Sequence, residues 1–103
     1  MNEQLWMELR EDAPRAVTAC LLYLQDRYPG QWQQKLTHPP TILAYLHTQA
    51  CDVKVVQFKL PNRQDWYYET YQASQLRHQA RGFHSFQQAA AAAIYNAFTQ
   101  LEA

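Results

Sequence analysis

The stretch SFQQAAAAAIYNAF, residues 85–98, constrains the fold more than any other part of this 103-residue chain. Ser85 followed three residues later by Gln88 forms a capping box, which predicts a helix that begins at Phe86 and runs to about Leu101. The apolar residues of this helix recur at helical spacing and form one inward stripe. They are Phe86, Ala89, Ala90, Ala93, Ile94, Ala97, Phe98 and Leu101. Because alanines dominate the stripe, the helix can lie close to a surface with large side chains.

The opposite side of this helix raises a separate question. No Asp, Glu, Lys or Arg occurs between Ser85 and Gln100, although a solvated helix face normally carries charges. The side that bears Ala92 and Tyr95 is therefore either covered by the N-terminal helices or exposed as a docking surface. If it is exposed, we expect a homodimer that forms through Ala92 and Tyr95.

Three helices are expected before the sheet. The first covers residues 2–11, and the second begins near Pro14, which suits a first helical turn, and runs to about residue 28. Residues 31–40 are expected to form a linker, and the third helix covers about 39–50.

The hydrophobic period then changes from that of a helix to that of a strand. The segments VKVVQFKL (53–60), DWYYETYQ (65–72) and LRHQARG (76–82) predict three strands, with a turn over 61–64. The expected fold class is α+β, in the order α-α-α-β-β-β-α. The C-terminal helix packs on a three-stranded antiparallel sheet, and the N-terminal helices lie around the other face or the edge of that sheet.

We expect residues 1–103 to form a single domain, since a chain of this length suits one core. Within it, residues 1–38 are the helical N-terminal part, and residues 39–103 are the αβββα part.

Composition and charge narrow the function classes. The chain has nine basic and nine acidic residues, and this balance disfavours a dedicated nucleic-acid binder. No apolar run approaches the ~20 residues of a membrane span, and the polar, acidic start is unlike a signal peptide. We therefore expect a cytoplasmic protein with no membrane contact. Cys20 and Cys51 form no CxxC motif and are expected to be reduced and buried.

No constellation of residues points to catalysis or to a cofactor. His47 and Cys51 are four residues apart and would share a helix face, but two ligands do not make a metal site. Ser85 beside His84 is explained by helix capping, and no GxSxG motif occurs. We therefore expect no catalytic residues, no metal and no cofactor, and the protein is not expected to be an enzyme.

The aromatic strand and its basic neighbours are the other candidate surface. Tyr67 and Tyr71 share one strand face, which we expect to bind a partner. Alternatively, basic side chains beside aromatic rings would make a stacking platform for nucleic acid. The residues of that platform are Arg63, Trp66, Arg77 and Arg81. Against both hypotheses, these aromatic residues could be core residues under the last helix on one face and under the first helices on the other.

The C-terminal part also resembles a known family. Residues 39–101 have the element order of a double-stranded-RNA-binding domain, and GFHSFQQAAAAAIYNAF (82–98) is similar to that family's final helix in its glycine, serine and alanines. The family places lysines in the first turn of this helix to contact phosphates. This chain has Phe86, Gln87 and Gln88 there, so the resemblance concerns the fold and carries no function.

These observations together favour a small, non-enzymatic protein-interaction module of the adaptor or inhibitor type. Its partner would be another protein or a second copy of the chain. Small size without a catalytic set also fits proteins encoded by phages or other mobile elements. The alternative is weak binding of RNA or single-stranded nucleic acid by the basic and aromatic sheet surface, which the neutral net charge disfavours.

Overall fold

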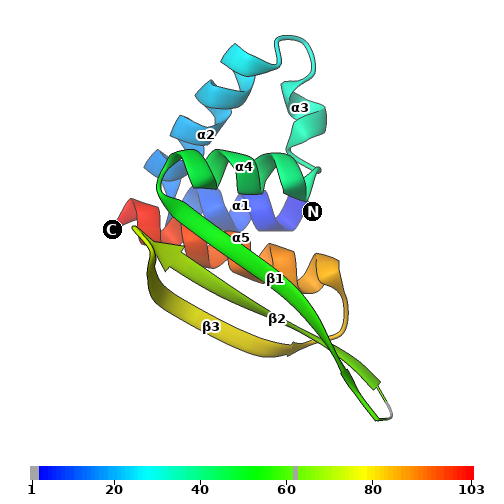
Figure 1. The fold of residues 1–103 in the computed structure, drawn as a ribbon. Coiled ribbons are helices and arrows are strands. Elements are labelled where there is room, and N and C mark those ends of the chain that lie inside the picture. The colour runs from blue at the N-terminus through cyan, green and yellow to red at the C-terminus, as the bar shows by residue number, and fades with distance from the viewer. Residues whose placement is uncertain (1–2, 62) are drawn as a thin grey trace.

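The helices and strands follow the expected order in a computed structural model that describes residues 3–61 and 63–103 (Figure 1). The side chains of residues 63 and 64 are also outside this description. The elements are α1 (Glu3–Asp12), α2 (Pro14–Arg27), α3 (Trp32–Lys35), α4 (Pro39–Thr48), β1 (Cys51–Leu60), β2 (Arg63–Gln72), β3 (Gln75–Phe83) and α5 (Phe86–Glu102). The α+β fold class, with a C-terminal helix packed on an antiparallel sheet, is confirmed.

Local sequence signals account for the starts of three helices. Pro14 and Pro39 each lie in a first helical turn, where their missing N–H group costs nothing. Ser85 caps α5, because its Oγ accepts a hydrogen bond of 3.2 Å from the backbone N–H of Gln88. The Gln88 side chain also reaches back, and it accepts from the backbone N–H of His84, one residue before the cap.

Two expected boundaries were wrong. The linker over 31–40 contains the short helix α3, whose Trp32 packs against the core. The third helix does not continue to residue 50 but ends at Thr48, and Ala50 has a φ of 58°. Because this left-handed conformation terminates a helix, β1 begins at Cys51.

The sheet is a meander in the order β1-β2-β3 with antiparallel neighbours. The turn predicted over 61–64 is tighter than expected, because Leu60 pairs directly with Arg63. Residue 62 in this turn, like residue 2 at the expected start of the first helix, lies outside the described residues. The second turn is also two residues long, and both Ala73 and Ser74 have positive φ, as a type I′ hairpin requires.

Helix α5 lies between two layers. One side faces the sheet, where Phe86 packs edge-on against Trp66, and Asn96 and Gln100 hydrogen-bond with Thr70 of β2. The other side packs against α1, α2 and α4, which group together on the far side of α5 from the sheet (Figure 1). The main hydrophobic core forms there, where Phe98 contacts the rings of Trp6 and Tyr45.

This arrangement explains why α5 carries no charge until its last turn. A helix buried on two opposite sides has little solvated surface, so charged side chains would lose their water. The alanines Ala89 and Ala93 lie on the same row as Asn96 and let the helix approach the large residues of β2.

The expected position of the N-terminal helices was therefore wrong in one respect. Helices α1 and α2 pack on α5 and not on the second face of the sheet, while α4 contacts both α5 and β1. The core joins side chains from α1, α2, α4, β1 and α5, and so includes both the 1–38 and the 39–103 parts. Cys20 and Cys51 are free and buried in this core, as expected. Among the described residues, no helix combines the length and the apolarity that crossing a bilayer would need.

Candidate functional site

The second face of the sheet is the most distinctive surface of the molecule. Successive side chains of a strand point to opposite faces, and Trp66 and Thr70 point toward α5. Tyr67, Glu69 and Tyr71 therefore lie on the opposite face. The helices pack on the α5 side, so in the described part of the chain this face has no covering layer. We call it the open face.

The register shows which neighbours share the open face. Val56 pairs with Tyr67, and Phe58 lies two residues further along β1 on the same side. On β3, Arg81 pairs with Tyr67, and Gln79 pairs with Glu69. The open face also includes Lys54, opposite Glu69, and Leu76, opposite Tyr71. Leu76 is 51% exposed.

Aromatic and cationic side chains contact one another across this face. The rings of Phe58 and Tyr67 lie 5.7 Å apart between centroids, and the guanidinium of Arg81 lies 6.0 Å from the Phe58 ring. At the other end, the Lys54 ammonium lies 5.3 Å from the centre of the Tyr71 ring. These are cation–π distances, and such contacts hold the rings and the long basic side chains in place.

A carboxylate lies in the middle of the face. Glu69 accepts a hydrogen bond of 3.1 Å from the hydroxyl of Tyr71. Desolvation, followed by this hydrogen bond, raises the pKa of Tyr71 above its usual value. Phe58, Tyr67, Glu69, Gln79 and Arg81 together line a hollow of about 300 Å³. The open face thus presents apolar rings and two cations, with Glu69 beside a shallow depression. The register also places Asp52 opposite Tyr71 and Asp65 opposite Phe58 on this face.

The structure brings together only some of the residues predicted for the sheet surface. Tyr67, Tyr71 and Arg81 share the open face, whereas Trp66 is on the side of α5. Arg77 is exposed on β3 and lines a separate hollow beside the C-terminal end of α5. Arg63 is the first residue of β2, and its side chain is outside the described part of the chain.

Lys54, Phe58, Glu69 and Gln79 also belong to this surface, although they were not among its predicted residues. Strand alternation combined with the correct register could have identified them, because each pairs with a residue of the neighbouring strand that points to the same face of the sheet. The strand sequence alone does not show which face is open, because Val55 and Val56 are apolar on opposite faces.

The other predicted surface, at Ala92 and Tyr95, lies beside α1. Both residues are half-buried and line a cavity of about 430 Å³ together with Leu5 and Glu8 of α1. The Tyr95 hydroxyl donates a hydrogen bond to Asp12. That bond first, then desolvation and the charges of Asp12 and Glu8, raise the pKa of Tyr95. Helix α1 therefore occupies much of the side of α5 that could have been a docking surface.

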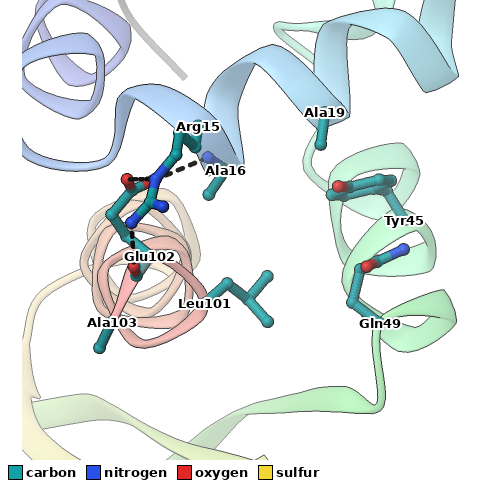
Figure 2. A pocket seen from close by; sticks show the side chains of 8 residues that line it. All are labelled: Arg15, Ala16, Ala19, Tyr45, Gln49, Leu101, Glu102 and Ala103. Atoms are coloured by element: carbon teal, nitrogen blue, oxygen red, sulfur yellow. Dashed lines mark hydrogen bonds and ion pairs between the residues drawn. The ribbon is translucent and has the colours of Figure 1, made fainter.

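A third cavity, of about 350 Å³, lies between α2, α4 and the end of α5 (Figure 2). Its charged groups are engaged with each other: the Arg15 guanidinium donates to the Glu102 carboxylate at 2.8 Å and to the Glu102 carbonyl at 3.2 Å. Glu102 also accepts from the backbone N–H of Ala16 at 2.8 Å, so it caps α2, whose own N-cap residue Ala13 makes no side-chain cap. Hydrogen bonds from Arg15 and then Ala16 lower the pKa of Glu102. We interpret this cavity as a structural junction.

His47 and Cys51 do not share a helix face. Because α4 ends at Thr48, Cys51 belongs to β1 and is buried in the core, while His47 is exposed and hydrogen-bonds with Asp52. Within the described residues, no three His, Cys, Asp or Glu side chains are grouped in a way that could hold a metal ion.

No family model matches the chain, and neither the curated proteins nor the solved structures include one that is significantly similar to it. Its function must therefore be inferred from the chemistry of its own surface.

Proposed function

We propose that this protein is a non-enzymatic protein-interaction module of the adaptor or inhibitor type, which binds its partner through the open face of the sheet. One observation carries the proposal: an antiparallel sheet with one solvated face normally has polar residues on that face. Here that face carries Val56, Phe58, Tyr67, Tyr71 and Leu76. Apolar side chains gathered on a face without a covering layer are typical of interaction sites.

The residue types on the open face also suit a protein partner. Protein interfaces are enriched in aromatic residues and arginine, and a few such residues supply most of the binding energy. The Phe58 ring contacts both Tyr67 and Arg81, so these side chains would enter an interface already ordered. An ordered set of side chains loses less conformational entropy on binding.

Nucleic-acid binding is the alternative, and the basic side chains support it. Lys54, Arg77 and Arg81 form no ion pair within the described part of the chain. Two features weigh against it. Glu69 lies between the two cations of the open face, where it would repel a phosphate. Trp66 lies on the α5 side, where it packs edge-on against Phe86, so it does not share a stacking surface with Arg81.

The remaining parts of the proposal concern the biological setting. A cytoplasmic location is one part of the proposal. Origin in a phage or another mobile element fits a small module that lacks a catalytic set. Self-association is one form of the proposed interaction. Because α1 lies beside Ala92 and Tyr95, we would assign a homodimer contact to the open face.

A matched pair of variants tests the proposal. Phe58→Ser with Tyr67→Ser removes two rings from the open face, and Met7→Ser with Leu22→Ser removes two side chains that are 62% and 61% exposed on the helices. Proteins captured from source cells by the wild type would be identified, purified and titrated against each variant. Loss of two central aromatic residues should cost about 2 kcal/mol or more, or about thirtyfold in Kd.

The control variant should bind as the wild type does, and circular dichroism should show that both variants are folded. Sedimentation velocity of the wild type tests self-association in the same samples. If only the Met7 and Leu22 variant loses the partner, the open face is not the site. If the wild type instead binds RNA with an affinity that falls steeply with salt, the nucleic-acid alternative replaces the proposal.

A further inference from the structure

Strand β3 is a long, exposed edge. Its side chains are exposed at most positions from Gln75 to Phe83. Among the described residues, its main contacts are with β2 and α5. Its free side therefore presents backbone N–H and C=O groups with which another strand could pair. The other edge strand, β1, differs because α4 packs against it and because Cys51 belongs to the core.

The charge on this edge has one sign. Strand β3 carries Arg77 and Arg81 and contains no acidic residue, and neither arginine is ion-paired with another described residue. Arg81 lies over the ring of Phe58, and Arg77 lines a hollow of about 450 Å³ at the end of α5. A group that docks along β3 would gain by bringing negative charge.

A second copy of the chain fits this edge poorly. Antiparallel self-pairing over the full strand would centre on Gln79, because nine residues from 75 to 83 would pair with their own copies. In that register, Arg77 of each copy lies opposite Arg81 of the other copy. Like charges directly opposite in a sheet are destabilising. The edge is therefore better suited to a different chain.

A nucleic acid also fits the backbone edge poorly. The free side of a strand offers donors and acceptors in alternation, whereas a phosphodiester chain offers only acceptors at its charged groups. An extended peptide matches both kinds of group, as in β-strand addition. Register shifts at Arg77 and Gly82 interrupt the pairing of β3 with β2, and residues 78–81 between them pair regularly with that strand.

We infer that the free edge of β3 takes up an extended acidic segment of the partner protein as a fourth strand, with carboxylates opposite Arg77 and Arg81. This inference rests on the proposed protein-binding function and specifies the partner's chemistry. Side chains of the added strand would alternate between the two faces, so half of them would extend the open face beside Leu76 and Arg81.

Two peptides based on β3 itself test the inference. The acidic peptide has the nine-residue sequence of β3 with both arginines replaced by glutamate, and the basic peptide keeps the native arginines. Each is titrated into the full-length protein and followed by backbone amide spectra and amide hydrogen exchange. The acidic peptide should bind at least roughly tenfold more tightly, since two like-charged pairs become opposite-charged pairs. It should also slow amide exchange on β3.

Charge reversal in the protein provides the decisive comparison. The variant Arg77→Glu with Arg81→Glu should reverse the preference and bind the basic peptide more tightly. The control variant Arg10→Glu with Arg27→Glu makes the same change of charge on exposed helix residues and should keep the wild-type preference.

Equal affinity for both peptides, or slowed exchange on β1 in place of β3, would overturn the inference. A short single-stranded RNA that displaces the acidic peptide and protects the β3 amides would overturn it as well. The proposed function would fail in a different experiment. If the variant Phe58→Ser with Tyr67→Ser bound the partner as tightly as the wild type, the open face would not be the binding site, and the peptide results on β3 would be unaffected.

Discussion

Replacing Ala93 by glutamate tests the sheet-facing side of α5. Ala93 is 0% exposed, and it lies three residues before Asn96, whose side chain hydrogen-bonds with Thr70 of β2. A glutamate at this position would therefore point into the space between helix and sheet. It would have to bury its carboxylate or push the two layers apart.

The expected cost is large compared with the stability of the molecule. An uncompensated buried charge costs about 3–5 kcal/mol. A chain of 103 residues has a total free energy of unfolding of about 5–15 kcal/mol. Because 1 kcal/mol lowers the Tm of a domain of this size by about 4–8 °C, Ala93→Glu should lower the Tm by at least about 12 °C or leave the chain unfolded.

The loss should also depend on pH. Burial raises the pKa of a carboxyl group, so the folded variant takes up a proton more readily than the unfolded chain. The destabilisation is then smallest below the carboxyl group's unfolded pKa and grows as the pH rises. Urea unfolding of the wild type, Ala93→Glu and the uncharged Ala93→Gln at several pH values measures this difference.

Ala92→Glu is the positional control, because Ala92 is only half-buried beside α1. It should destabilise the protein much less than the change at Ala93. If Ala93→Glu unfolds at the same urea concentration as the wild type at every pH, then Ala93 does not face the sheet and the layer arrangement is incorrect.

Two further predictions concern the chain ends and a turn. Glu102→Ala should lower the Tm at neutral pH but leave it unchanged at a pH well below the folded pKa. The reason is that the lowered pKa of Glu102 makes its contacts with Arg15 and Ala16 stabilising above its unfolded pKa, and this contribution is lost as the pH falls through the folded value. Replacing Ala73-Ser74 by Asn-Gly should raise the free energy of unfolding by about 1 kcal/mol, because both residues have positive φ and Asn-Gly suits a type I′ turn. An unchanged urea midpoint would show that this turn stores no strain.

Several parts of the fold could be predicted because their signals are local. Ser85 and Gln88 mark the start of α5, Pro14 and Pro39 mark the starts of two helices, and the change of hydrophobic period marks the sheet. In each case the physical cause acts within one or two turns of the chain. The same is true of the candidate residues Tyr67 and Tyr71, whose shared face follows from strand alternation.

Other features depend on partners far away in the sequence. The N-terminus of α2 is capped by Glu102, which is 86 residues from Ala16, and Tyr95 bonds with Asp12 across 83 residues. No local pattern indicates such contacts. They arise only when α5 lies between the sheet and the N-terminal helices.

The open face shows the difference most clearly. The sequence by itself determined that β1 and β2 are strands and that apolar residues occupy both of their faces. Only the tertiary structure decided that α1 and α2 pack on α5, which leaves Phe58, Tyr67 and Tyr71 uncovered. The physical reason is that α5 is apolar on two opposite sides and can bury only one against the sheet. Its second apolar side takes the helices that would otherwise cover the open face.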